Sequence, residues 1–127
     1  YYSNMEKTIE IIASPAYLPE RSDPIRSYYF FSYQIHIINR SKEKVQLLSR
    51  YWRITDGEGR VEDIHGPGVI GKTPILKPEE PFEYTSFCPL PTPLGFMEGS
   101  YRMKNSSGKE FDAIIGRFQL VAHQALN

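Results

Sequence analysis

A glycine-rich stretch from His65 to Thr73, HGPGVIGKT, carries the clearest chemical pattern in this 127-residue sequence. It fits both G-x-G-x-x-G and G-x-x-x-x-G-K-[ST], in which backbone amides and a lysine hold phosphate groups where a strand leads into a helix. No helix is expected to follow here, because Pro74 and Pro78 interrupt the chain and a proline inside a helix costs about 3 kcal/mol. The sequence therefore argues against a P-loop that hydrolyses nucleotides.

The same loop could still bind an anion without a helix. Successive glycine amides, here those of Gly66, Gly68 and Gly71, can form a nest that accepts phosphate or pyrophosphate, and Lys72 or Arg60 can add positive charge. The favoured alternative is a structural loop, in which the glycines adopt conformations that other residues avoid and two apolar residues enter the core. Those two residues are Val69 and Ile70.

Residues suited to metal binding or catalysis are scattered along the sequence. Glu58, Glu62 and Asp63 flank the glycine loop and could hold a hard cation such as Mg²⁺, but hairpin charges that face solvent are the favoured interpretation. Because neighbours on a strand point to opposite faces, Glu62 and Asp63 would not chelate together unless the strand ends there. No metal-ligand spacing links the histidines, which are His36, His65 and His123. We therefore expect no metal, no cofactor and no enzyme active site.

Aromatic side chains indicate a surface for a protein partner. In Tyr28 to Phe31, YYFF, large rings fall on both faces of one strand, so some of them must meet either a covering loop, which is favoured, or a partner. Tyr51 and Arg53 fall on the face opposite Trp52, and tyrosine and arginine are frequent anchors of interfaces. The sequence predicts partner contacts at Tyr51 and Arg53.

Short β-strands must position these residues. Aromatic and β-branched residues gather in short segments, with prolines and glycines between them. Tyr28 to Asn39 alternates most clearly and predicts a core face of Tyr29, Phe31, Tyr33, Ile35 and Ile37, with Ser32, Gln34 and His36 on the wet face. Further strands are expected at Thr8 to Ala13, Val45 to Thr55, Arg60 to Ile64, Phe82 to Phe87, Gly99 to Lys104, Lys109 to Ile115 and Phe118 to Val121.

The segment from Val45 to Thr55 contains an irregularity. Leu48, Trp52 and Ile54 share one phase, but Arg50 falls in the same phase, which predicts a bulge or a strand end. A tight hairpin is expected at Asp56-Gly57-Glu58-Gly59. Seven to eight short strands with turns between them predict an all-β fold, an antiparallel sandwich of the immunoglobulin or fibronectin-III type.

Length and composition predict one intracellular domain over residues 1–127, with Tyr1 to Lys7 as a flexible extension and Ala122 to Asn127 as a short tail. Fifteen basic and fifteen acidic residues balance, so nucleic acid is not an expected partner. Cys88 is the only cysteine and is expected to be a buried small hydrophobe in a reducing cytosol. No membrane span or signal-peptide pattern is expected.

Several segments together resemble the ApaG domain family: SRYWRITDGEGRVEDIHGPGVIG, FEYTSFCPL, MEGSYRM and FDAIIGRFQL, with LPERSDP before the aromatic strand. The resemblance runs from about Ile9 to Asn127. It implies a fibronectin-III-like sandwich, in agreement with the strand pattern. It also implies a stand-alone bacterial cytoplasmic protein in a family linked to cobalt and magnesium resistance.

The family resemblance leaves two functions open. Related domains fused to eukaryotic proteins are taken to be protein-interaction modules, which implies a binding or accessory role with a protein partner. The family's G-x-G-x-x-G, here Gly66, Gly68 and Gly71, has also been proposed to bind pyrophosphate, which would make phosphate, alone or together with a divalent cation, the ligand of the loop. Protein binding is the preferred expectation, and the oligomeric state, monomer or homodimer, stays open.

Overall fold

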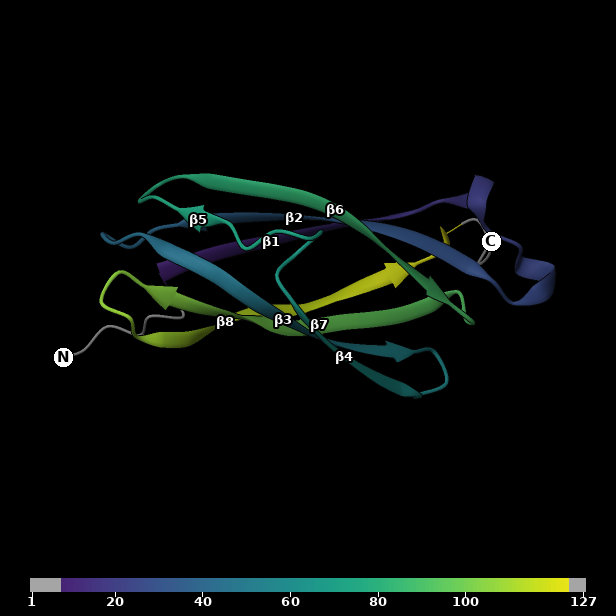
Figure 1. The fold of residues 1–127 in the computed structure, drawn as a ribbon. Coiled ribbons are helices and arrows are strands. Elements are labelled where there is room, and N and C mark those ends of the chain that lie inside the picture. The colour runs from purple at the N-terminus through teal and green to yellow at the C-terminus, as the bar shows by residue number, and fades with distance from the viewer. Residues whose placement is uncertain (1–7, 124–127) are drawn as a thin grey trace.

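The computed structural model describes residues 8–123, which form two antiparallel β-sheets packed face to face (Figure 1). The first sheet has the order β1-β2-β6 and consists of β1 (Ile9–Tyr17), β2 (Tyr29–Asn39) and β6 (Pro81–Leu90). The second has the order β4-β3-β7-β8 and consists of β4 (Val61–Pro67), β3 (Val45–Asp56), β7 (Leu94–Asn105) and β8 (Glu110–Val121), with β5 (Ile75–Leu76) paired to β3. The predicted antiparallel sandwich is confirmed, with eight strands.

Strand β2 forms the centre of the first sheet, and its alternation is the predicted one. Phe31, Tyr33, Ile35 and Ile37 are buried between the sheets, while Tyr29 is half-buried. Apolar side chains on every second residue must all point to one face of a strand, so burying that face fixes the register of β2 against its neighbours.

The aromatic on the other face of β2 is covered by the segment that precedes the strand. This segment holds two short 3-10 helices, η2 (Pro19–Arg21) and η3 (Pro24–Arg26). The Arg21 guanidinium lies over the Phe30 ring, 4.4 Å from its centroid, and the Phe30 amide donates to Ser22 Oγ at 2.8 Å. Phe30 is only 9% exposed, so the expected covering loop accounts for this ring.

A bulge in β3 decides which side chains face the core. Pairing with β7 shifts register between Leu47 and Ser49, so Leu47 is fully buried and Leu48 is only half-buried. The predicted irregularity is confirmed, but the expected core position of Leu48 is wrong, because the extra residue reverses the alternation ahead of it. After the bulge, Arg50 and Trp52 share the inner face.

The remaining predicted strands are present, but several extend beyond their predicted ends, and β5 was not expected. The hairpin between β3 and β4 turns at Asp56 to Gly59, where Asp56 Oδ1 accepts hydrogen bonds from the amides of Glu58 and Arg60 at 2.8 and 3.0 Å. The two strands expected at the end of the sequence are one continuous strand, β8. A register shift between Met97 and Gly99 in β7 lets β8 continue past the irregular point.

The predicted extension Tyr1 to Lys7 and the last four residues of the predicted tail lie outside the described residues. Within residues 8–123, no helix has the length and apolar character needed to cross a membrane.

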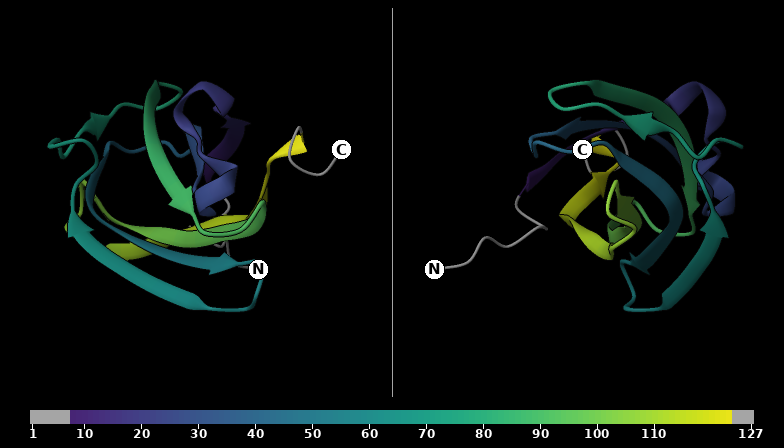
Figure 2. Two further views of the ribbon diagram at one scale, coloured as in Figure 1. Left: turned by 90° about the vertical axis from the view of Figure 1, so that its right-hand side faces the viewer. Right: turned by 60° about the vertical axis from the view of Figure 1, so that its left-hand side comes forward.

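The two long sides of the sandwich differ. Strands β1 and β8 lie against each other and close one side. On the other side, the outer strands of the two sheets, β6 and β4, stand apart in the left view of Figure 2. A cleft lined by residues of β4 and β6 lies on this side.

Candidate functional site

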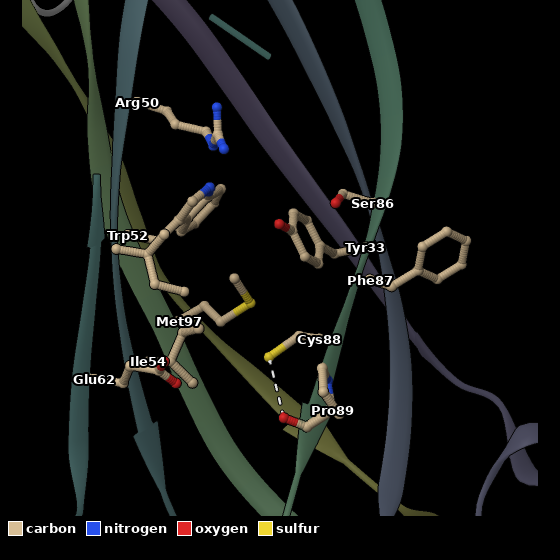
Figure 3. Close-up of a pocket in the computed structure, with 11 residues that line it drawn as sticks. Tyr33, Arg50, Trp52, Ile54, Glu62, Ser86, Phe87, Cys88, Pro89 and Met97 are labelled. Atoms are coloured by element: carbon tan, nitrogen blue, oxygen red, sulfur yellow. Dashed lines mark hydrogen bonds between the residues drawn. The ribbon is translucent and has the colours of Figure 1, made fainter. Parts of the chain in front are cut away.

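A cleft opens between β3 and β4 of one sheet and β2 and β6 of the other (Figure 3). It consists of two adjoining hollows, each of about 340 Å³, a size that suits a small ligand or a few side chains of a partner. The residues that line both hollows are Tyr33, Arg50, Trp52 and Ser86. One hollow reaches the glycine loop, and the other is walled by apolar residues that include Ile54, Ile64, Cys88 and Met97.

Arg50 is the cationic group of the cleft. Its Nη1 donates to the carbonyl oxygens of Pro67 and Gly68, each at 2.9 Å, so two carbonyls of the glycine loop hold the guanidinium in place. Arg50 is half-buried and forms no ion pair with any of the residues 8–123. Its positive charge therefore lies in the cleft, partly exposed, without a carboxylate of the described residues beside it.

Gly66 leaves the space that Arg50 occupies. The two residues are paired across β3 and β4, and a β-carbon at position 66 would lie 2.8 Å from the guanidinium carbon of Arg50. Gly66 is not among the glycines with positive φ, so the expectation that all three loop glycines need unusual backbone angles is wrong at this position. Its lack of a side chain serves the packing of Arg50.

Hydroxyl groups face Arg50 from the other sheet. In Figure 3 the hydroxyls of Tyr33 and Ser86 point toward the space in front of the guanidinium. Burial raises the pKa of Tyr33 against the lowering effect of its hydrogen bond with Ser86, and burial also raises the pKa of Tyr84, whose hydroxyl bonds to that of Tyr101. These phenols are therefore neutral near pH 7 and can donate hydrogen bonds to a ligand.

Cys88 lines the apolar hollow and is 3% exposed. Burial raises the pKa of its thiol to about 12, with a smaller contribution from the charge of Glu62. Since the thiolate is the nucleophilic form, this thiol is unreactive near pH 7 and acts as the small hydrophobe that the sequence predicts.

The backbone of the glycine loop is closed on itself. The amides of Val69 and Lys72 donate to each other's carbonyls at 2.8 and 2.9 Å, and the amide of Gly68 donates to Leu48 O at 2.8 Å. Gly68 has a φ of 58°, and a β-carbon there would lie 2.2 Å from Lys72 O. Three of the loop amides are thus committed to the fold.

The tip of the loop remains open. Within the described residues, the amides of Ile70 and Gly71 donate no hydrogen bond, and Lys72 is exposed. Val69 is fully buried as expected, but Ile70 is 53% exposed, so its expected place in the core is wrong. Ile70 takes a φ of 43° at the tip of the turn, where its side chain is left at the surface.

Tyr51 and Arg53 lie on the opposite, outer face of the second sheet, where they surround Asp63. Tyr51 Oη donates to Asp63 Oδ1 at 2.9 Å, and the Arg53 guanidinium donates to both Asp63 oxygens at 2.9 and 3.0 Å. These two donors, Arg53 before Tyr51, lower the pKa of Asp63 to about 2. The ring of His65 stacks on Tyr51 at 4.8 Å. The cluster is held rigidly, and its role as a partner contact stays a prediction.

The candidate metal residues do not converge. Glu62 lines the cleft while Asp63 is on the outer face, as the alternation of a strand requires. His36 contacts Glu83, and His123 lines a separate hollow near Tyr17. Within residues 8–123, no three His, Cys, Asp or Glu side chains are grouped so that they could hold a metal ion.

In the sequence, Arg50 stands out only as a charged residue in the same phase as the apolar residues of its strand. This phase was the available signal, because an arginine that shares the phase of a buried tryptophan must face inward unless a bulge lies between the two residues. Its hydroxyl neighbours come from strands far away in the sequence, and no spacing pattern connects them.

Comparison with known proteins places the chain among ApaG sequences. The model of the family described as ApaG domain matches residues 19–105. The chain is similar to Protein ApaG of Mesorhizobium japonicum, with 52% identity over 119 residues that cover 94% of this chain and 92% of the relative. It is also similar to Protein ApaG of Beijerinckia indica, with 46% identity over 99% of both chains. A crystal structure from Bordetella pertussis superposes with a TM-score of 0.88 at 45% identity, covering 89% of this chain and 92% of the other.

Proposed function

The chain belongs to the ApaG domain family, and we propose that it is a non-catalytic binding protein that holds a protein partner in the cleft between its two sheets. The observation that carries this proposal is Arg50, a half-buried cation without a carboxylate beside it among the described residues, held at the centre of the cleft by two backbone carbonyls. A buried charge is costly unless it is paired, so a ligand that supplies the missing charge gains from binding here.

The strand edges beside the cleft favour an extended segment of a protein as the partner. Strands β4 and β6 are outer strands of their sheets, and each leaves one row of backbone groups unpaired within the described fold. Such an edge can accept a further strand through main-chain hydrogen bonds, with pockets for alternate side chains. Ile64 on β4 is 36% exposed at the rim of the cleft and can contact such a side chain.

The chemistry of the cleft favours binding over catalysis. Tyr33, Tyr84 and Cys88 have raised pKa values and stay protonated near pH 7, so none of them is a ready general base or nucleophile. The Arg50 guanidinium is a cation that can stabilise negative charge, which serves recognition equally well.

A second candidate function is phosphate or pyrophosphate binding at the tip of the glycine loop. The free amides of Ile70 and Gly71 and the exposed Lys72 support it. Titration of the protein with pyrophosphate, with and without Mg²⁺, while the backbone amides are followed by NMR, tests this function. Saturable shifts at Ile70 to Lys72 that Lys72→Ala weakens would support it, and flat amides at millimolar pyrophosphate would exclude it.

We further propose a cytoplasmic location in a bacterium, since the similar proteins are bacterial and the single cysteine is a buried free thiol. The link to cobalt and magnesium resistance stays an expectation from the family.

Two substitutions on the same strand test the cleft. Ile64 and Val61 both lie on β4 and are exposed to 36% and 52%, but Ile64 lines the cleft and Val61 does not. We expect Ile64→Glu to abolish the capture of partners from a bacterial lysate and Val61→Glu to preserve it, with Tyr51→Ala as a probe of the outer face. If Ile64→Glu captures the same proteins as the unmodified protein, the cleft is not the binding site.

A further inference from the structure

The charged groups of the cleft indicate which chemical group the partner must carry. Two hydrogens of Arg50 Nη1 are used by Pro67 O and Gly68 O, while no hydrogen bond within the described residues uses Nε or Nη2. A guanidinium offers donors in a planar fork that matches the two oxygens of a carboxylate. The hydroxyls of Tyr33 and Ser86 add neutral donors from the opposite sheet.

The charge balance favours a carboxylate over a phosphate. Arg50 is the only Lys or Arg among the residues that line the two hollows, and no histidine lines them. One positive charge is balanced by one carboxylate, whereas a phosphate group carries about 1.5 to 2 negative charges at pH 7. A phosphate would therefore bring excess negative charge into a partly apolar cavity.

The other end of the cleft carries the opposite charge. Glu62 pairs with Ile54, four residues along β3 from Arg50, which corresponds to roughly 13 Å at about 3.3 Å per residue. Apolar side chains, those of Trp52, Ile54, Ile64 and Met97, line the hollow between the two charges. A ligand that lies in the hollow between Arg50 and Glu62 must therefore be negative beside Arg50, apolar in the middle, and neutral or positive beside Glu62.

From this arrangement we propose that the cleft binds an extended apolar peptide segment of about four residues, with a carboxylate of that segment held by Arg50 and the hydroxyls facing it. The segment lies along the free edge of β4 or β6. The carboxylate is that of a free C-terminus or of an acidic side chain. This inference rests on the proposed function and specifies the chemistry of its partner.

The test uses four synthetic probes and the intrinsic fluorescence of Trp52, the only tryptophan of the protein and a wall of the cleft. The first probe is N-acetyl-Lys-Val-Ile-Val with a free carboxylate, and the second is its C-terminal amide. The third is N-acetyl-Lys-Val-Ile-Glu amide, whose only carboxylate is a side chain. Inorganic pyrophosphate is the fourth.

We expect the first or the third probe to bind at least about tenfold more tightly than the C-terminal amide, which has no carboxylate, because only they pair with the guanidinium. Whichever of the two binds identifies the source of the carboxylate. Arg50→Gln is expected to remove this preference, and Arg53→Gln, on the outer face, is expected to leave it unchanged.

Gly66→Ala keeps the charge but displaces it, since the new methyl group would overlap the guanidinium of Arg50. We therefore expect Gly66→Ala to weaken carboxylate binding while the protein stays folded, which separates the position of Arg50 from its presence. Tyr33→Phe removes one hydroxyl from the cleft without changing Arg50 and gives a second check. We expect it to weaken binding of the carboxylate probe more than binding of the amide probe.

Three results would overturn this inference: equal affinity for carboxylate and amide probes, an unchanged preference in Arg50→Gln, or no binding of any peptide at millimolar concentration. Tighter binding of pyrophosphate in competition with the peptide at Arg50 would overturn it as well. If Ile64→Glu loses partners while the peptides show no carboxylate preference, the cleft keeps its proposed function and only the carboxylate is wrong. If Ile64→Glu keeps its partners, the proposed function itself fails.

Discussion

At the scale of single residues, the glycine motif has three physical roles rather than one. Gly66 gives room to the Arg50 guanidinium, Gly68 allows the close approach of Lys72 O, and Gly71 takes a φ of 75° beside no near neighbour. A sequence pattern for phosphate binding therefore coincides with a loop whose main contact is a guanidinium. The pattern predicted where the loop lies, but the local sequence does not indicate that Arg50 contacts it.

The two glycines with positive φ provide a matched pair. Both Gly68→Ala and Gly71→Ala force a side chain into left-handed backbone, which costs about 1 kcal/mol, but only Gly68→Ala also meets a backbone oxygen, at 2.2 Å. We expect Gly68→Ala to lower the free energy of unfolding by about 3 kcal/mol and Gly71→Ala by about 1 kcal/mol. Urea denaturation measures both, and equal losses would show that the loop relaxes around the new methyl group.

The outer-face cluster makes a prediction in acid. Asp63 has a pKa of about 2 in the folded protein, below its ordinary 3.8, because Arg53 and then Tyr51 donate to it. A lowered folded-state pKa means that the stabilisation by Asp63 is present above pH 4 and is lost as the pH falls from about 4 to about 2. An NMR titration of the Asp63 carboxyl should give this value, and Arg53→Gln should return it toward 3.8. An ordinary pKa in the unmodified protein would show that the cluster does not persist in solution.

Among the strands and turns, the alternation of β2 and the turn at Asp56 to Gly59 could be predicted from the sequence, because strand periodicity and turn residues are local properties. Which side chains of β3 point into the core could be predicted only in part. One extra residue at the bulge exchanges the buried and exposed sets on its N-terminal side, which places Leu47 rather than Leu48 in the core. Because the bulge precedes Arg50, Arg50 keeps the inward phase of Trp52. The sequence signals that an irregularity exists but does not give its position.

The close pairing of β7 with β3 depends on a glycine, Gly99, which lies next to the point where β8 has one extra residue opposite β7. A β-carbon at Gly99 would lie 1.9 Å from Tyr51 O in the neighbouring strand, and paired backbone does not move aside as the end of a flexible side group does. We expect Gly99→Ala to disrupt the pairing of β3 with β7 and to cost about 3 kcal/mol or more of stability. Gly116→Ala, in β8, meets no atom within 4 Å and is the control, expected to be neutral or slightly stabilising in thermal unfolding. Equal effects of the two substitutions would contradict this role of Gly99.

At the scale of the whole molecule, function follows from an asymmetry of the sandwich. The β1 and β8 side is closed, while the β4 and β6 side leaves an opening with one inward arginine and two free strand edges. Pro81 and Pro89 lie in the outer strand β6, where missing amide donors limit unspecific strand pairing. The fold class was predictable from the number and spacing of short strands. The cleft was not, because Tyr33, Arg50 and Ser86 meet only through the packing of two sheets.

The most direct test of a binding cleft is an NMR map of backbone amide shifts during separate titrations with N-acetyl-Lys-Val-Ile-Val and N-acetyl-Lys-Val-Ile-Glu amide. We expect at least one of the two peptides to give saturable shifts at the residues of the cleft, among them Arg50, Ile64 and Ser86, with the outer-face residues Tyr51 and Arg53 changed little. Shifts confined to Ile70 to Lys72, or to the face of Tyr51 and Arg53, would contradict it, because the binding surface would then be the loop tip or the outer sheet face instead of the cleft.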